Sequence, residues 1–220
     1  MLQGADGNLY GMALLGGANG CGTIFELSTS GTLVHLYSFP CGAGGYAPQG
    51  ALIQASDGNL YGTTALGGTI SKRGDCIQGC GTIFKYSHGL VSILYRFSGS
   101  PGDGGVANAG LTEGTDGYLY GGTDLGGTYD QGALYRITTG GQYTLLYSLQ
   151  TQIGAGANAA LFQHTNGTFY GNASFDGRYF EGSVYSLNMG LSPFIALVRY
   201  SGRMGGPCKS WAKASRRQRQ

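Results

Sequence analysis

The chain repeats one six-residue motif four times at nearly equal spacing, and this repetition constrains the fold more than any other feature. The copies begin 51, 59 and 50 residues apart, and they are Asp6-Gly-Asn-Leu-Tyr-Gly11, Asp57-Gly-Asn-Leu-Tyr-Gly62, Asp116-Gly-Tyr-Leu-Tyr-Gly121 and Asn166-Gly-Thr-Phe-Tyr-Gly171. A period near 50 residues is typical of one supersecondary unit used several times in tandem. The architecture must therefore be built from that unit.

Each unit contains several short apolar runs separated by glycine. In the second unit the Leu-Tyr run of the motif is accompanied by runs at residues 50–54, 81–86 and 91–97. The runs are rich in aromatic and β-branched residues and alternate with period two, which is the pattern of β-strands. No apolar stretch keeps a helical period over three turns, and the glycines disfavour a helix. We therefore predict about four strands per unit.

An Asp-Gly or Asn-Gly pair between two apolar runs predicts a hairpin turn in which both central residues take positive φ. The predicted turn residues are Asp57 and Gly58, Asp116 and Gly117, and Asn166 and Gly167. A catalytic or calcium-binding role for these acids is the alternative. Asn166 favours the turn, because asparagine retains turn chemistry and loses the charge.

Four-stranded antiparallel units of about 50 residues in tandem are typical of propeller blades. We predict an all-β, β-propeller-like fold with about four blades of four antiparallel strands over residues 1–190. The alternative is an open stack or β-solenoid, whose rungs would be shorter. The last unit lacks its outer run, so the ring is expected to be open or poorly latched, and exposed strand edges favour self-association.

The repeat resembles that of the GloVer (Gloeobacter/Verrucomicrobia) tandem-repeat proteins of bacteria. The match rests on residues 57–64 (Asp-Gly-Asn-Leu-Tyr-Gly-Thr-Thr), on Gly67-Gly68, on residues 81–84 (Gly-Thr-Ile-Phe) and on residues 36–39 (Leu-Tyr-Ser-Phe). The resemblance implies a surface or secreted parent protein with a propeller-type repeat. It carries no catalytic residue over to this chain.

Both ends of the sequence suggest a fragment. Residues 2–6 align with residues 53–57, so Met1 falls inside a unit, and no signal peptide is present. A cytosolic protein is the alternative to a lost N-terminus. Residues 191–206 resemble the link into an immunoglobulin-like IPT/TIG domain, which does not follow. Residues 207–220 form a basic tail, which we expect to be disordered and out of frame after Pro207.

Composition excludes several partners and cofactors. The tail holds five basic residues and no acid, so the rest of the chain carries a net charge of −3 rather than the overall +2. The basic balance therefore does not indicate nucleic-acid binding. No apolar run approaches the roughly 18 residues that span a membrane. No phosphate loop or dinucleotide motif occurs, and the histidines His35, His88 and His164 differ in register, so no cofactor or metal is expected.

Cys76 and Cys80 lie in an insertion that lengthens the second unit and are close enough to pair. A disulfide there would fit an oxidising compartment, and reduced surface thiols are the alternative.

The blade loops vary in length and are the expected contact surface, because loops on a rigid scaffold carry function. Asp124, Tyr129 and Asp130 in the third unit form the one candidate ligand-facing cluster. We expect a non-enzymatic module of an extracellular or cell-surface bacterial protein that binds polysaccharide or another surface protein. A polysaccharide-acting hydrolase or lyase and a purely structural spacer are the alternatives.

Overall fold

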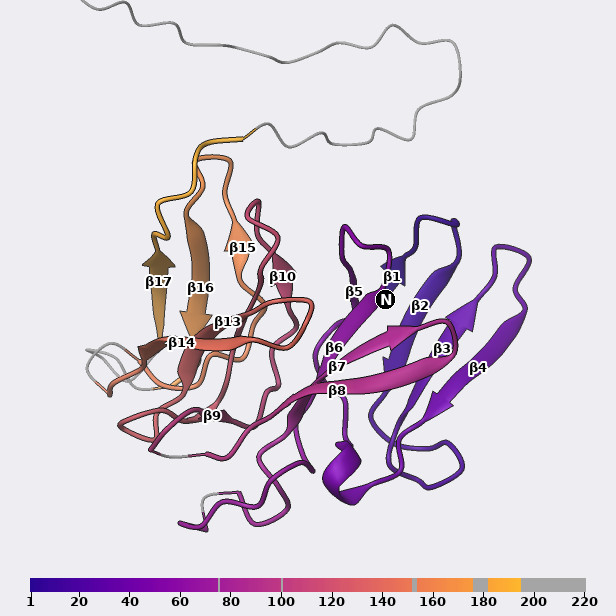
Figure 1. Cartoon of the computed structure of the whole chain (residues 1–220), viewed down its shortest axis with the longest axis horizontal. Helices are drawn as coiled ribbons and strands as arrows, with labels where there is room; N and C mark the ends of the chain where they lie inside the picture. The colour runs from indigo at the N-terminus through magenta and orange to yellow at the C-terminus, as the bar shows by residue number, and fades with distance from the viewer. Residues whose placement is uncertain (75, 100, 152–153, 176–181, 195–220) are drawn as a thin grey trace, which may run out of the picture.

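The computed structural model describes residues 1–74, 76–99, 101–151, 154–175 and 182–194. Apart from one short 3-10 turn, η1 (Gly42–Gly44), its regular elements are β-strands. The strands form successive antiparallel sheets, and the first and fourth sheets lie at opposite ends of the row (Figure 1). The predicted all-β, propeller-like and open architecture is confirmed.

Each sheet is assembled from consecutive strands of one repeat. The first contains β1 (Leu2–Gln3), β2 (Leu9–Ala13), β3 (Thr23–Leu27) and β4 (Leu33–Ser38). The second contains β5 (Ile53–Gln54), β6 (Leu60–Thr64), β7 (Thr82–Ser87) and β8 (Leu90–Arg96). The third contains β10 (Thr112–Glu113), β11 (Leu119–Gly122), β13 (Ala133–Ile137) and β14 (Tyr143–Ser148). The fourth contains β15 (Phe162–Gln163), β16 (Phe169–Ala173) and β17 (Ser183–Leu187). Outside these four sheets, β9 (Gly104–Gly105) pairs with β12 (Leu125–Gly126) as a separate two-stranded sheet.

The register of the central strands gives each sheet two apolar faces. In the second sheet, Leu60 pairs with Tyr86 and Gly62 with Phe84, so these side chains share one face. The alternate residues, including Tyr61 and Ile83, lie on the other face because successive side chains point to opposite sides of a strand. A sheet of this kind must be covered on both sides.

Neighbouring sheets cover each other and form a separate core at each junction. Ile24 and Phe39 of the first unit pack with Leu60 and Phe84 of the second. Between the second and third units, the core contains Tyr61, Ile83, Leu119 and Tyr135, all of which are at least 95% buried. The third and fourth units meet through Tyr120 and Phe169, whose ring centroids are 4.2 Å apart.

The motif turns differ from the predicted geometry. In the second unit the Gly58 N–H donates to the Ala55 carbonyl at 2.8 Å, and Gly58 has φ +81° whereas Asp57 is not in the positive-φ region. The turn is therefore a type I turn followed by one left-handed glycine, not a two-residue turn with two positive φ angles. The third and fourth motifs bend in the same way, with Gly117 at φ +78° and Gly167 at φ +88°.

Backbone hydrogen bonds join consecutive units at the opposite end of the sheets from these turns. The N–H groups of Ala47, Val106 and Gly156 donate to the carbonyls of Cys21, Cys80 and Gln131, at 2.8–3.1 Å. All three donors have positive φ. Alanine and valine tolerate this conformation poorly, so the link between units outweighs a local backbone cost.

The glycine that ends each motif lets an aromatic ring lie against the backbone of the neighbouring strand. A methyl group on Gly62 would come within 2.6 Å of Phe84 Cζ, and one on Gly171 would come equally close to Tyr185 Cζ. Gly11 and Gly121 are covered in the same way by Phe25 and Tyr135. Glycine recurs at this position because the aromatic ring lies too close to the backbone for any side chain. The ring covers the strand at that point.

Replacing Gly62 with alanine tests this packing. We expect Gly62→Ala to lower the free energy of unfolding by about 1–3 kcal/mol, because the added methyl group overpacks a buried ring. Urea denaturation monitored by circular dichroism would measure the loss. Gly140→Ala is the control, since a methyl group there makes only an ordinary contact of 3.7 Å. Equal effects of the two substitutions would contradict the packing argument.

Candidate functional site

A cleft of about 350 Å³ lies where the third and fourth units meet. Loops from both units form its walls, and its lining residues are Val106, Asp124, Leu125, Asp130, Gln131, Ala155, Gly156 and Phe175. Apolar and polar groups therefore face one space, which is the usual composition of a ligand pocket.

Asp124 supplies a largely buried carboxyl group to this cleft. It lies two residues after the end of β11, and its Oδ2 accepts a hydrogen bond from Asn108 Nδ2 at 2.6 Å. Its Oδ1 is buried and has no hydrogen-bond partner among the described residues. Burial raises the pKa of Asp124, although the bond from Asn108 acts in the opposite direction. Asp124 thus brings to the cleft a carboxyl group with one unused acceptor oxygen, which is itself covered by protein atoms.

Asp130 adds a second carboxylate from the loop between β12 and β13. Its Oδ1 accepts a hydrogen bond from the Gly126 N–H at 2.9 Å, and its φ of +56° places it in the left-handed region. This bond fixes the carboxylate relative to the Gly126–Gly127 bend. The structure therefore places Asp124 and Asp130 on one cleft.

Tyr129, the third residue of the predicted cluster, does not line the cleft. Its side chain is 54% exposed. That Asp124 and Asp130 face a ligand stays a prediction, and the structure does not bring Tyr129 to them.

Phe175 is the cleft residue that sequence reasoning missed. It is 61% exposed, and its backbone pairs with Ala155. The corresponding position after the Leu-Tyr strand holds leucine in the other units, at Leu15, Leu66 and Leu125. An aromatic residue in a leucine position of an exposed loop was the available signal. Phe175 lines the cleft only because the fourth unit packs beside the third, and the sequence alone did not show how the two units pack.

The motif aspartates lie at the turns, away from this cleft. Asp57 Oδ1 accepts the Asn59 N–H at 3.0 Å, and its Oδ2 accepts the Tyr61 hydroxyl at 2.6 Å. Asp116 and Tyr120 repeat the contact at 2.7 Å. Asn166 accepts the Thr168 N–H at 2.9 Å. Each side chain holds its own turn closed, and the aspartates also bind the tyrosine of their own motif.

Hydrogen bonding dominates the ionisation of Asp57. Burial raises its pKa, but the bonds from Tyr61, Asn59 and Lys85 outweigh this effect and hold the pKa below the ordinary value. Lys85 Nζ lies 3.2 Å from Asp57 Oδ2. At Tyr120, burial and the bond to Asp116 raise the pKa to about 12.

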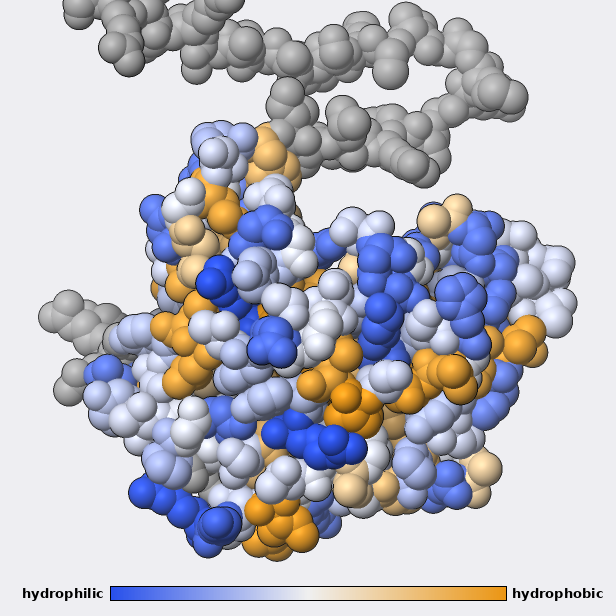
Figure 2. Space-filling model, in the orientation of Figure 1, coloured by the Kyte–Doolittle hydropathy of each residue, from blue (hydrophilic) through white to orange (hydrophobic). Residues whose placement is uncertain are grey.

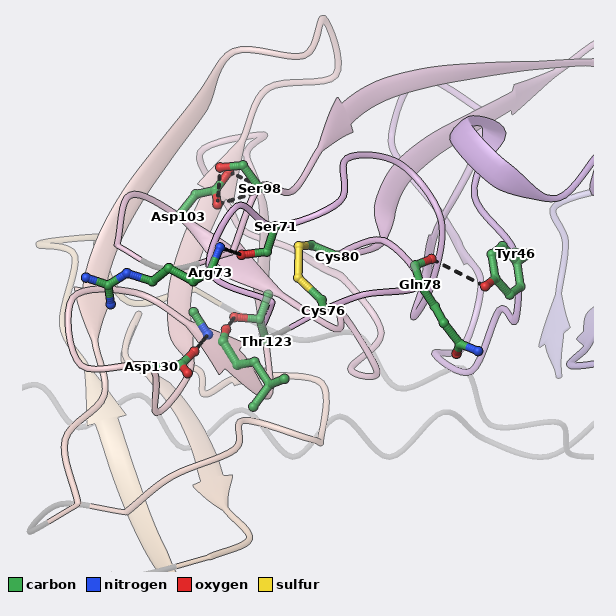
Figure 3. Close-up of a disulfide and its surroundings, with 12 residues drawn as sticks. Tyr46, Ser71, Arg73, Cys76, Gln78, Cys80, Ser98, Asp103, Thr123 and Asp130 are labelled. Atoms are coloured by element: carbon green, nitrogen blue, oxygen red, sulfur yellow. Dashed lines mark hydrogen bonds between the residues drawn. A yellow bond between two sulfur atoms is a disulfide. The ribbon is translucent and has the colours of Figure 1, made fainter.

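Two disulfides crosslink the loops. Cys76 and Cys80 are bonded, with both residues almost fully buried in the core between the second and third units. Figure 3 shows this disulfide, with Tyr46 on one side of it in the view and Asp130 on the other. Cys21 and Cys41 form a second disulfide, which sequence reasoning did not predict. Cys21 and Cys80 hold the same position, directly before a Gly-Thr-Ile-Phe strand.

Neither a metal centre nor a membrane-spanning helix occurs in the part of the chain that the structure describes. No three His, Cys, Asp or Glu side chains gather there into a metal-binding group. Within the same residues, no helix has the length and apolar character to cross a bilayer. The expected linker beyond residue 194 and the basic tail lie outside the described residues.

Comparison with known proteins identifies the family to which the repeat belongs. The family model described as the Gloeobacter/Verrucomicrobia repeat matches residues 65–211, more than half of the chain. Among solved structures, the chain is similar to selenomethionine-substituted virginiamycin B lyase from Staphylococcus aureus, with a TM-score of 0.47 and 15% sequence identity. That similarity covers 86% of this chain and 58% of the lyase chain. No curated protein matches the chain.

The tyrosine–aspartate contact predicts a difference between the second and fourth units. Tyr61→Phe should lower the free energy of unfolding by about 1.5–3 kcal/mol, because it removes a hydrogen bond to a charged group. Tyr170→Phe is the matched control, since Asn166 stands in place of the aspartate and no bond from Tyr170 to it is formed. We expect that control to stay within about 0.5 kcal/mol of the parent in urea denaturation. Equal losses would contradict the assigned role.

The lowered pKa of Asp57 predicts a pH dependence. Its carboxylate stabilises the fold above the unfolded-state pKa of about 4, and this contribution is lost as the pH falls through the lower folded-state pKa. Between about pH 5 and pH 2, the parent should lose more stability than Asp57→Asn. Thermal unfolding across this range would measure the difference, and parallel curves for the two proteins would rule the effect out.

Proposed function

Since the chain belongs to the Gloeobacter/Verrucomicrobia repeat family, we propose that it is a non-enzymatic binding module of a secreted or cell-surface bacterial protein. Its ligand is a polysaccharide, held in the cleft between the third and fourth units. The single observation that carries this proposal is that the exposed ring of Phe175 lines the same cleft as the carboxyl groups of Asp124 and Asp130.

A sugar ring has the chemistry that these groups require. One face of a pyranose presents C–H groups, which pack against an aromatic ring such as that of Phe175. Its edge presents hydroxyl groups, which donate to carboxylate oxygens such as those of Asp124 and Asp130. An apolar surface with a few fixed polar groups provides orientation as well as affinity.

An extracellular location is supported by the two disulfides, Cys21–Cys41 and Cys76–Cys80. Disulfides persist in oxidising compartments and are rare in the reducing cytosol. We therefore propose that the parent protein acts outside the cytoplasm.

A polysaccharide hydrolase is the second candidate. The observation that favours it is the raised pKa of Asp124, which suits a general acid, in the same cleft as Asp130. Glycosidases use two carboxyl groups in this way. The binding module is preferred because Asp130 is held by the backbone of its own loop, an arrangement that fixes a ligand contact.

Binding to a glycan panel tests the proposal with substitutions taken from the chain itself. Asp124→Ala copies Ala65, and Phe175→Leu copies Leu66, so both variants should fold. Each should weaken binding about tenfold, the equivalent of about 1.4 kcal/mol. Phe162→Leu is the control, because Phe162 is another exposed phenylalanine of the same unit and does not line the cleft.

Release of reducing ends in the same assay separates the two candidates. Binding without release supports the module, and release that Asp124→Ala abolishes supports the hydrolase. Glycan binding that is unchanged in both cleft variants would refute the proposed site.

A further inference from the structure

The two end units each expose a face that is buried in every other unit. In the second sheet, the forward face, which carries Tyr61 and Ile83, packs on the third unit. The backward face, which carries Leu60 and Phe84, packs on the first unit. Among the described residues, no unit covers the forward face of the fourth unit or the backward face of the first (Figure 1). Hydrophobic residues are visible at the surface over the fourth sheet (Figure 2).

The forward face of the fourth unit shows the loss of cover most clearly. The equivalent side chains Ile24, Ile83 and Leu134 are 0–3% exposed, whereas Val184 is 81% exposed. Likewise, Tyr61 and Tyr120 are fully buried, and Tyr170 is 38% exposed. This face is therefore an uncovered copy of a surface that the chain buries three times.

The backward face of the first unit is its counterpart. Leu60, Leu119 and Phe169 are 0–5% exposed, whereas the equivalent Leu9 is only partly buried. Phe25 is also partly buried, although Phe84 in the same position is fully covered. Apart from His35, which pairs with Phe25 on the first unit's backward face, the strand residues of the two faces carry no charged side chain, so no like charges oppose each other across them.

A polar contact recurs at each junction and is incomplete at the two ends. Gln54 Oε1 accepts the Ala5 N–H at 2.8 Å, Glu113 Oε2 accepts the Ser56 N–H at 2.8 Å, and Gln163 Oε1 accepts the Thr115 N–H at 3.0 Å. The equivalent acceptor of the first unit is Gln3, and the equivalent donor of the fourth is Thr165. Within the described residues, Gln3 Oε1 and the Thr165 N–H have no partner.

We propose that a second copy of this chain docks head to tail on these faces. The forward face around Tyr170 and Val184 of one copy would cover the backward face around Leu9 and Phe25 of the next. Gln3 Oε1 of the second copy would accept the Thr165 N–H of the first. We infer a second copy because the chain itself pairs a forward face with a backward face at each of its three junctions. The same polar contact accompanies each pairing.

Such a contact joins unlike surfaces, so it produces a closed ring if the rotation between copies closes and an extended array if it does not. Exposed apolar surface would be buried in either case. The proposal does not depend on the cleft or its ligand.

Sedimentation of the full chain over a range of concentrations tests the proposal. We expect concentration-dependent association by about 100 µM, and Val184→Asp should weaken it at least tenfold, because a charge would be buried against an apolar face. Ile70→Asp is the matched control. Ile70 is 64% exposed, is also aliphatic, and lies in the second unit away from both end faces.

A charge pair provides the second test. Leu9→Lys alone should also weaken association, and the double variant Val184→Asp with Leu9→Lys should recover part of it, since the two charges then meet at each junction. Circular dichroism would verify that every variant is folded. A monomer at all concentrations, or association that Val184→Asp leaves unchanged, would overturn the proposal.

Discussion

The structure depends on one constraint, which is that each four-stranded sheet is apolar on both faces. A sheet of this kind cannot stand alone in water, so every unit needs a neighbour on each side. Because an aromatic ring lies over the motif glycine, neighbouring sheets can pack closely on each other. In the second unit, Phe84 covers Gly62 and at the same time enters the core shared with the first unit. Strand pairing within a unit and packing between units are thereby coupled through the same side chain.

Much of this architecture was accessible from sequence because its causes are local and repeated. Alternation of apolar residues identified the strands, and the spacing of the motif identified the unit. The turn type was predicted wrongly, because an Asp-Gly pair occurs in two kinds of hairpin that differ in loop length. The bond from Gly58 to Ala55 depends on where strand pairing begins, and the dipeptide does not reveal that.

The candidate site was predicted only in part, for a related reason. Asp124 and Asp130 are close in sequence, so they could be grouped in advance, but Phe175 reaches the cleft from the next unit. The disulfide between Cys21 and Cys41 spans 20 positions and depends on how the loop after β4 returns. Tyr129 was included because of its neighbours, and the left-handed conformation of Asp130 could not be foreseen. Contacts between units require the stack itself, which no single repeat encodes.

The two disulfides bear on the history of the chain. Cys21 and Cys80 occupy one position of the repeat, yet Cys21 bonds to a later residue and Cys80 to an earlier one. Gln131 stands at the corresponding position of the third unit and is not a cysteine. A crosslink inherited from the ancestral repeat would join the same two positions in each copy. The different partners therefore indicate that the two crosslinks arose separately after duplication, and that the first and second units each secure the same point of the backbone in a different way.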